Sequence, residues 1–243
     1  DTAPSTGSSF SIWRMLRSVY IPTSGFIRRA SLRSLLQPFV RNEHEIYQTS
    51  SGMNVVEIRS SKDKDKRDLK TLVLMHGYGA GSGMFVRNFD DLIEKGFDRV
   101  IAIDWPGMGC SSRRKAEAAG SPSIGIFDSI LTSIGLKQAA DPHGNSQIDF
   151  YIDELERWRT EDQARIGSGS GSGKFVLAGH SLGGFLSARY CQKYPDNVSA
   201  LVLISPAGMS ARPPKESLTT STSFSDRRWF PTIATAAWGM NIT

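Results

Sequence analysis

Short apolar runs recur along the chain, separated by glycine-rich turns and by stretches with helical periodicity. Four runs are nearly continuous, as is typical of strands buried on both faces of a parallel sheet, and they lie at 69–75, 99–103, 174–178 and 201–204. Apolar positions at helical spacing fall between them, at about 84–95, 150–158 and 182–194. Because strands and helices alternate, the pattern predicts an α/β fold built on a mostly parallel sheet.

Changes in pattern mark the borders of this core. Residues 45–48 and 54–59 alternate polar and apolar positions on either side of a turn signal at 49–52, which predicts a β-hairpin. Residues 111–147 show little periodicity and are expected to form a long loop or insertion. We expect three parts: a leader over 1–42, the core over 43–210, and the start of a lid or cap over 211–243.

The positive charge of the chain is concentrated in the leader. The formal net charge is +5, and residues 1–42 account for all of it with six arginines, no lysine and one acid. Acidic and basic side chains balance over the rest of the chain. The core therefore offers no basic surface, and nucleic acid is not an expected partner.

Apolar residues of the leader fall into two stripes at helical spacing. These are Ile12, Trp13, Leu16, Val19 and Tyr20, followed by Leu32, Leu35, Leu36, Phe39 and Val40. Three interpretations stay open: a mitochondrial targeting sequence, an anchor that lies on a membrane or lipid-droplet surface, and a disordered tail. The first two predict a mitochondrial location or a peripheral one at a membrane or droplet.

Other features exclude several classes of protein. No run reaches the roughly 18 consecutive apolar residues of a membrane-spanning helix, and the mean hydropathy is −0.27. Cys110 and Cys191 are the two cysteines, too few for a disulfide framework. We expect reduced thiols and an intracellular protein. The sequence has no metal-ligand cluster and no phosphate-binding loop, so no cofactor is expected.

The segment Gly179-His180-Ser181-Leu182-Gly183 has the pattern GxSxG between an apolar run and a helical stretch. A nucleophilic serine must project from a tight strand-to-helix turn, and flanking glycines leave room for that turn. The N–H of Leu182, at the start of the helix, suits a developing oxyanion. We predict that Ser181 is the nucleophile, and that His180 is an elbow residue rather than a base.

The segment His76-Gly77-Tyr78-Gly79 follows the first buried strand of the parallel pattern. An oxyanion hole needs two N–H groups from separate segments, and a glycine-rich bend can aim the N–H of Tyr78 toward Ser181. Gly77 and Gly79 would permit this bend. His76 is expected to be a structural residue of the turn.

The chain resembles the α/β-hydrolase superfamily through three segments. They are LVLMHGYGAG at 72–81, DWPGMGCSS at 104–112 and AGHSLGGFLSARYCQKYP at 178–195. The resemblance covers about residues 40–215 and implies an α/β-hydrolase core, with Ser181 as nucleophile, Tyr78 and Leu182 as oxyanion donors, and Asp104 as a structural loop residue.

Further segments are similar to one subfamily, that of lysophospholipases, N-acyl-phosphatidylethanolamine lipases, cardiolipin deacylases and related lipolysis co-activators. They are GHSLGGFL, FYIDELERWR at 150–159, LVLISPAGM followed by Arg212-Pro213, and Trp13 with Pro22-Thr23-Ser24. This resemblance implies a phospholipid or lysophospholipid substrate. Some co-activators of this branch lack the serine, whereas this chain has it, which favours an enzyme.

A catalytic base is missing from the pattern. In this fold an acid and then a histidine follow the serine, but the four histidines are His44, His76, His143 and His180. None has an aspartate five positions later, so the HxxxxD motif that the subfamily associates with acyl transfer is absent. We expect an internal fragment, truncated before the last strands, that shows little esterase activity by itself.

The resulting hypothesis is a serine hydrolase that cleaves carboxylic ester or amide bonds of phospholipids through an acyl-enzyme, with acyl transfer as a related outcome. Two alternatives stay open. One is a non-catalytic partner that regulates lipolysis or binds lipid. The other is an α/β-hydrolase of small molecules, such as a peptidase or a C–C hydrolase.

Overall fold

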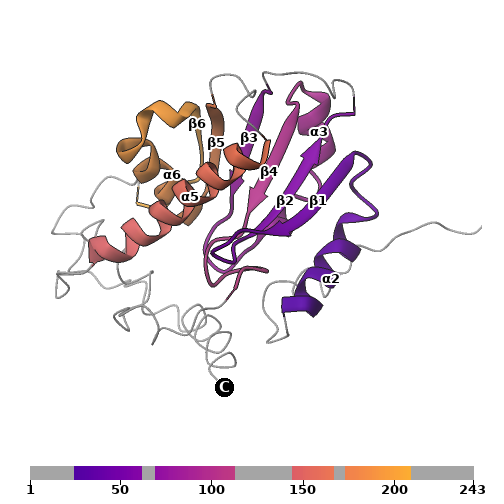
Figure 1. Ribbon diagram of the computed structural model, residues 1–243, viewed down its shortest axis with the longest axis horizontal. Coiled ribbons are helices and arrows are strands. Elements are labelled where there is room, and N and C mark those ends of the chain that lie inside the picture. The colour runs from indigo at the N-terminus through magenta and orange to yellow at the C-terminus, as the bar shows by residue number, and fades with distance from the viewer. Residues whose placement is uncertain (1–24, 62–68, 113–143, 167–172, 209–243) are drawn as a thin grey trace, which may run out of the picture.

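The chain folds into one mixed sheet with helices on both faces (Figure 1). The computed structural model describes residues 25–61, 69–112, 144–166 and 173–208. Its strands are β1 (Glu43–Gln48), β2 (Asn54–Arg59), β3 (Thr71–Met75), β4 (Arg99–Ile103), β5 (Phe175–His180) and β6 (Val198–Ile204). Its helices are α2 (Gly25–Leu36), η1 (Ser82–Phe85), α3 (Phe89–Glu94), α5 (Gly144–Ile166), α6 (Leu182–Lys193) and η3 (Pro195–Asn197).

The strand order is β1-β2-β4-β3-β5-β6. Strands β1 and β2 pair antiparallel, from Glu43 opposite Arg59 to Gln48 opposite Asn54, which confirms the predicted hairpin. Strand β2 is also antiparallel to β4, while β4, β3, β5 and β6 run parallel. The predicted α/β fold with a mostly parallel sheet is therefore confirmed, and the carboxyl ends of β3, β4 and β5 meet at one edge.

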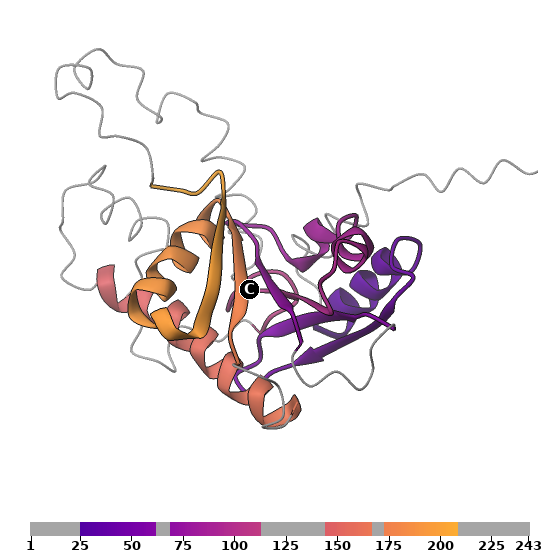
Figure 2. The ribbon, with the colours of Figure 1, turned by 90° about the horizontal axis from the view of Figure 1, so that it is seen from above.

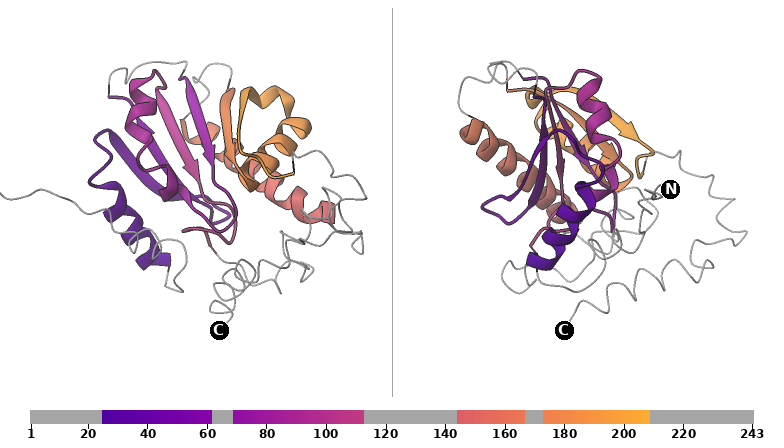
Figure 3. Two further views of the ribbon diagram at one scale, coloured as in Figure 1. Left: turned by 180° about the vertical axis from the view of Figure 1, so that it is seen from behind. Right: turned by 90° about the vertical axis from the view of Figure 1, so that its right-hand side faces the viewer.

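Helices cover both faces of the sheet (Figure 2 and Figure 3, right), with an apolar layer between them and each face. Helices α5 and α6 cover one face through Ile148, Ile152, Leu155, Trp158, Leu182, Leu186 and Tyr190. Helices α2 and α3, with η1, cover the other through Leu32, Leu35, Leu36, Phe85, Phe89 and Ile93. The central strands β3 and β4 contribute side chains to both layers, which explains their continuous apolar runs.

The second apolar stripe of the leader belongs to this core. Leu32, Leu35, Leu36 and Val40 are buried beneath the sheet face that α2 covers, so this stripe does not face a membrane. An amphipathic helix has the same sequence pattern whether its apolar face meets lipid or a protein core, and for that reason the sequence could not distinguish the two. The first stripe, at 12–20, lies outside the described residues.

Element bounds differ from the expected ones at several places. The stretch expected as one helix over 84–95 is a short η1 turn followed by α3, and α5 is longer than expected because it runs from Gly144 to Ile166. The described part of the expected 111–147 loop is limited to 111–112 and the start of α5. The rest of that loop and the expected lid lie outside the described residues.

Candidate active site

Ser181 lies between β5 and α6 in a backbone conformation that side chains rarely adopt, with φ 53° and ψ −117°. Its hydroxyl makes no capping hydrogen bond to α6. The backbone of this turn is held instead by the Ser181 N–H donating to the Ile204 carbonyl at 3.0 Å and the Ala207 N–H donating to the Ser181 carbonyl at 2.9 Å. The serine oxygen is thus left available at the carboxyl edge of the sheet, as a nucleophile elbow requires.

Three positions around Ser181 have no space for a side chain and therefore require glycine. A Cβ on Gly179 would collide with the carbonyl of Gly183, and one on Gly183 would lie 2.5 Å from the His76 carbonyl oxygen. Gly184 is similarly enclosed, because its Cβ would lie 2.9 Å from the Gly179 carbonyl oxygen. Close approach of α6 to β5 and to the end of β3 therefore depends on these three positions.

The predicted oxyanion loop lies directly against the elbow. A Cβ built on Gly77 would be 3.1 Å from Cβ of Ser181, and Gly79 has a φ of 66°, which favours glycine. Leu182 is the first residue of α6, where a backbone N–H has no intrahelical acceptor. The structure thus brings Tyr78 and Leu182 to the same side of the sheet edge as Ser181, and their oxyanion role stays a prediction.

His76 is a buried, neutral structural residue. The Trp105 N–H donates to His76 Nε2 at 3.1 Å, so Nδ1 carries the proton and donates to the Gly77 carbonyl at 2.7 Å. Burial lowers the pKa of His76, and this effect outweighs the nearby Asp104 carboxylate, which raises it. The ring thus fixes the loop that carries Tyr78 and has no free nitrogen to act as a base.

Asp104 organises the loops at this edge. Its carboxylate accepts hydrogen bonds from the Ser82 N–H at 2.5 Å, the Cys110 N–H at 2.8 Å and the Asn54 amide at 3.0 Å. The Ser111 hydroxyl donates to the Asp104 carbonyl at 2.6 Å. These bonds join the loops after β3 and β4 to β2, in agreement with the structural role implied by the resemblance. Sequence reasoning missed Asn54, which belongs to no motif, and assigned no role to Ser111 within the 104–112 segment.

An aromatic cluster borders the oxyanion loop and was also missed. The rings of Trp105 and Tyr151 meet edge to face at 5.9 Å, and those of Phe150 and Tyr151 at 5.4 Å. Tyr78 packs partly buried against the same apolar layer. Burial, with a smaller contribution from Tyr78, raises the pKa of Tyr151 to about 12, so its hydroxyl stays protonated at neutral pH.

No histidine of the described residues hydrogen-bonds the Ser181 hydroxyl. His44 is exposed on β1 and contacts the Asn42 carbonyl, His76 is engaged in the turn, and His143 lies outside the described residues. His180 Nδ1 is buried without a hydrogen-bond partner, next to Gly77. The acid and base that a serine nucleophile needs are therefore not assembled within this part of the chain.

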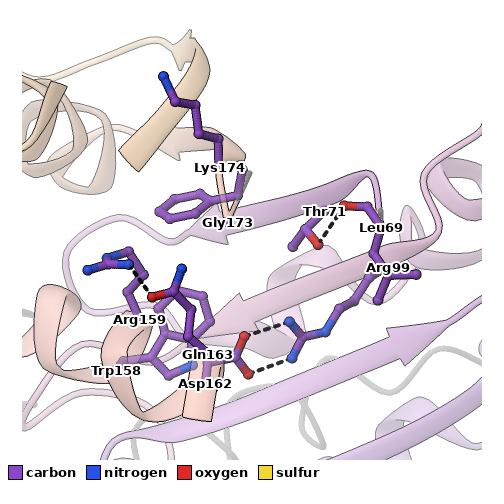
Figure 4. Close-up of a pocket in the computed structure, with 10 residues that line it drawn as sticks. Leu69, Thr71, Arg99, Trp158, Arg159, Asp162, Gln163, Gly173 and Lys174 are labelled. Carbon is purple, nitrogen blue, oxygen red and sulfur yellow. Dashed lines mark hydrogen bonds and ion pairs between the residues drawn. The ribbon is translucent and has the colours of Figure 1, made fainter. Parts of the chain in front are cut away.

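A cavity lies at the opposite edge of the sheet, around the starts of β3, β4 and β5 (Figure 4). Arg99 and Asp162 line it, and Arg99 donates to both oxygens of Asp162 at 2.5 and 2.6 Å and, outside the lining, to Glu57 at 2.5 Å. Burial lowers the pKa of Arg99, but the hydrogen bonds to Asp162 and Glu57 outweigh it and raise the pKa. Because Ser181 lies at the other edge, this cavity is not its substrate site.

The described ranges contain neither a metal-binding cluster nor a membrane-spanning helix. In residues 25–61, 69–112, 144–166 and 173–208, no group of three or more His, Cys, Asp or Glu side chains has a geometry able to hold a metal ion. Over the same ranges no helix has the length and apolar character needed to cross a bilayer.

Known proteins give a consistent comparison. A family model described as the alpha/beta hydrolase fold matches residues 70–233. A protein of Arabidopsis thaliana named 1-acylglycerol-3-phosphate O-acyltransferase is 32% identical over 206 residues, which cover 79% of this chain and 41% of that protein. The Rattus norvegicus protein named 1-acylglycerol-3-phosphate O-acyltransferase ABHD5 is 36% identical over 143 residues, 58% of this chain and 31% of that protein.

Among solved structures, a membrane phospholipase A described as a bacterial virulence factor is similar, with a TM-score of 0.47, 24% identity, and coverage of 77% of this chain and 47% of that chain. The chain spans less than half the length of the curated relatives it matches. Since the family model covers most of the chain and the elbow and sheet have the order that this fold requires, the chain belongs to the α/β-hydrolase fold family.

Proposed function

We propose that the protein forms an acyl-enzyme at Ser181 and acts on carboxylic ester bonds of phospholipids or lysophospholipids. The elbow carries this proposal, because Ser181 is held at a φ of 53° with a hydroxyl that caps no helix. Such strain costs about 1–3 kcal/mol at a residue other than glycine, and a structural serine would not need it. Two relatives are named as acyltransferases of 1-acylglycerol-3-phosphate, which supports a lipid ester as the substrate.

In the proposed reaction, Ser181 Oγ attacks the ester carbonyl carbon while its proton passes to a base. The N–H groups of Tyr78 and Leu182 donate to the oxyanion of the tetrahedral intermediate. Collapse breaks the ester bond, and the leaving alcohol takes the proton from the base. Water, or the hydroxyl of an acyl acceptor, then attacks the acyl-enzyme and frees Ser181. Hydrolysis and acyl transfer differ only in that acceptor.

The base in this proposal is a histidine oriented by a carboxylate, as in other serine-nucleophile sites. It belongs to a part of the whole protein outside the described residues, because His44, His76 and His180 make no hydrogen bond to Ser181 in the described part of the chain.

The same observation favours a second candidate function, a non-catalytic partner that binds lipid or regulates lipolysis. The two candidates differ in whether the serine oxygen matters. In the second, Ser181→Ala leaves the effect on lipolysis intact, whereas in the first it abolishes turnover.

Labelling with a fluorophosphonate probe tests the proposal. We expect the natural full-length protein, and its Ser199→Ala control on exposed β6, to be labelled at Ser181, while Ser181→Ala is not. The 243-residue chain alone is expected to show little esterase turnover. Absence of labelling in the full-length protein would favour the non-catalytic partner, and robust Ser181-dependent turnover by this chain alone would require a base among its own histidines.

A further inference from the structure

The outer side of α2 exposes large apolar side chains. Phe26 is 72% exposed and Ile27 is 51% exposed, in the same helix whose Leu32, Leu35 and Leu36 are buried in the core. Helix α2 lies against η1, where Met84 is 37% exposed. The buried stripe packs α2 on the sheet, whereas Phe26, Ile27 and Met84 stay exposed outside that packing.

Positive charge flanks these apolar residues. The sequence of α2 is GFIRRASLRSLL, with three arginines and no acid. Arg28 is buried, whereas Arg33 is exposed and Arg29 is half-buried. Two acids of the neighbouring α3, Asp90 and Glu94, are bound by Arg41. We name Phe26, Ile27, Arg29, Arg33 and Met84 the α2 surface.

The α2 surface borders the edge of the sheet at which Ser181 lies. The buried Arg28 side chain donates to the Ser111 carbonyl at 3.4 Å, and Ser111 is bound to Asp104 at the end of β4. Asp104 in turn binds the first residue of η1, Ser82, after the end of β3. A chain of contacts thus fixes α2 to the loops that also position the oxyanion loop.

We propose that the α2 surface docks on the surface of an anionic lipid layer, with Phe26, Ile27 and Met84 entering the interface and Arg29 and Arg33 contacting the lipid phosphates. Exposed apolar residues beside arginines are the combination that holds helices at such interfaces, and each arginine gains from the negative surface potential. A second copy of the chain fits less well, since it would oppose arginines to arginines with no acid on α2 to pair them. The link to Ser181, though not the docking itself, rests on the proposed function.

Flotation with vesicles tests the docking. The full chain carries Ser181→Ala so that no turnover alters the lipid, and the vesicles are phosphatidylcholine with or without phosphatidate. We expect Phe26→Ser/Ile27→Ser to weaken binding to both kinds by at least about tenfold. Arg29→Gln/Arg33→Gln is expected to remove the preference for phosphatidate by a similar factor.

Two controls lie away from the α2 surface. Val202→Ser removes an exposed apolar side chain from β6, and Arg189→Gln removes an exposed arginine from α6. Both are expected to bind vesicles as the parent does. Circular dichroism checks that every variant is folded. As a second measurement, we expect brominated phosphatidylcholine to quench the emission that Ile27→Trp adds to that of the five native tryptophans, with the parent as reference.

Three results would overturn the proposal. They are absent binding by the parent, binding unaffected by the Phe26 and Ile27 substitutions, and no quenching of the Ile27→Trp indole. Dimerisation that these substitutions abolish, without vesicle binding, would assign the surface to a second copy instead. None of these outcomes depends on catalysis, because Ser181 is replaced by alanine in the protein used for flotation. Hydrolysis of a short-chain ester by the full-length protein with Ser181 intact tests the proposed function separately.

Discussion

The backbone conformation of Ser181 depends on the glycines around it, because the neighbouring backbone leaves no space for a side chain there. The helix after it approaches the end of β3 so closely that a Cβ on Gly183 would lie 2.5 Å from the His76 carbonyl oxygen and collide with the carbonyl of Met75. Neither carbonyl can move easily, since Met75 is paired with both β4 and β5 and the His76 carbonyl accepts from the Trp105 indole N–H at 3.1 Å.

Gly183→Ala is therefore expected to lower the free energy of unfolding by about 3 kcal/mol, at the upper end of overpacking costs, and to abolish probe labelling of Ser181. Gly96 is the matched control. Its φ is 101° but a Cβ there would meet nothing within 4 Å, so Gly96→Ala is expected to cost only backbone strain, about 1–2 kcal/mol. Urea unfolding of both variants measures these changes in the free energy of unfolding. Equal stability and equal labelling would contradict the steric explanation.

At the scale of single residues, the sequence could predict only what a local motif contains. The turn residues around Ser181 and His76 are contiguous in the chain, so their place in the fold followed from pattern. Asn54 reaches Asp104 from 50 residues away, and such a contact exists only after the strands have paired. No base for Ser181 lies among the described residues, so the role of Ser181 as nucleophile stays a prediction.

Among the elements, α2 and α3 show how a segment that was expected to be separate becomes part of the core. The chain between α2 and β1 is fixed to α3 through Asp90, which accepts from the Arg41 N–H at 2.8 Å, the Arg41 side chain at 3.1 Å and the Asn42 amide at 2.8 Å. No hydropathy pattern signals this link, because its partners are polar and 48 or 49 residues apart.

The link between α2 and α3 is expected to weaken in acid. Burial raises the pKa of Asp90, but hydrogen bonds from Asn42 and Arg41 outweigh it, and the net pKa lies below its ordinary value of 3.8. A depressed pKa contributes stability that is complete above the unfolded-state value and is lost as pH falls through the folded-state value. Asp90→Asn should thus be less stable than the parent at neutral pH, and the difference should shrink as pH falls below about 4.

Urea unfolding at a series of pH values checks this, with Asp91→Asn as the control on the exposed side of α3. A difference between parent and Asp90→Asn that persists unchanged at the lowest pH would show that the carboxylate charge does not stabilise the link.

Across the whole molecule, the two edges of the sheet have different roles. The loops that follow β3, β4 and β5 converge at one edge around Ser181, which is where open α/β sheets bind their ligands. At the other edge, Arg99 joins β4 to β2 through Glu57 and to α5 through Asp162, with all three side chains buried. Removing Arg99 would take the bidentate cation from the buried Asp162, which also accepts from the Tyr47 hydroxyl at 3.3 Å. Glu57 would keep its ion pair with Arg59 at 2.6 Å.

Arg99→Met is therefore expected to cost about 3–5 kcal/mol of unfolding free energy, as is usual when one partner of a buried ion pair is lost. Arg159→Met removes a half-buried arginine that binds Glu156 on the same helix and should cost about 1 kcal/mol or less.

In the full-length protein, the folded fraction of Arg99→Met should still react with a fluorophosphonate at the parent rate, because Arg99 and Ser181 lie at opposite edges. A loss of reactivity in folded protein would mean that the two edges are coupled, and an effect as small as that of Arg159→Met would mean that hydrophobic packing alone holds α5 on the sheet.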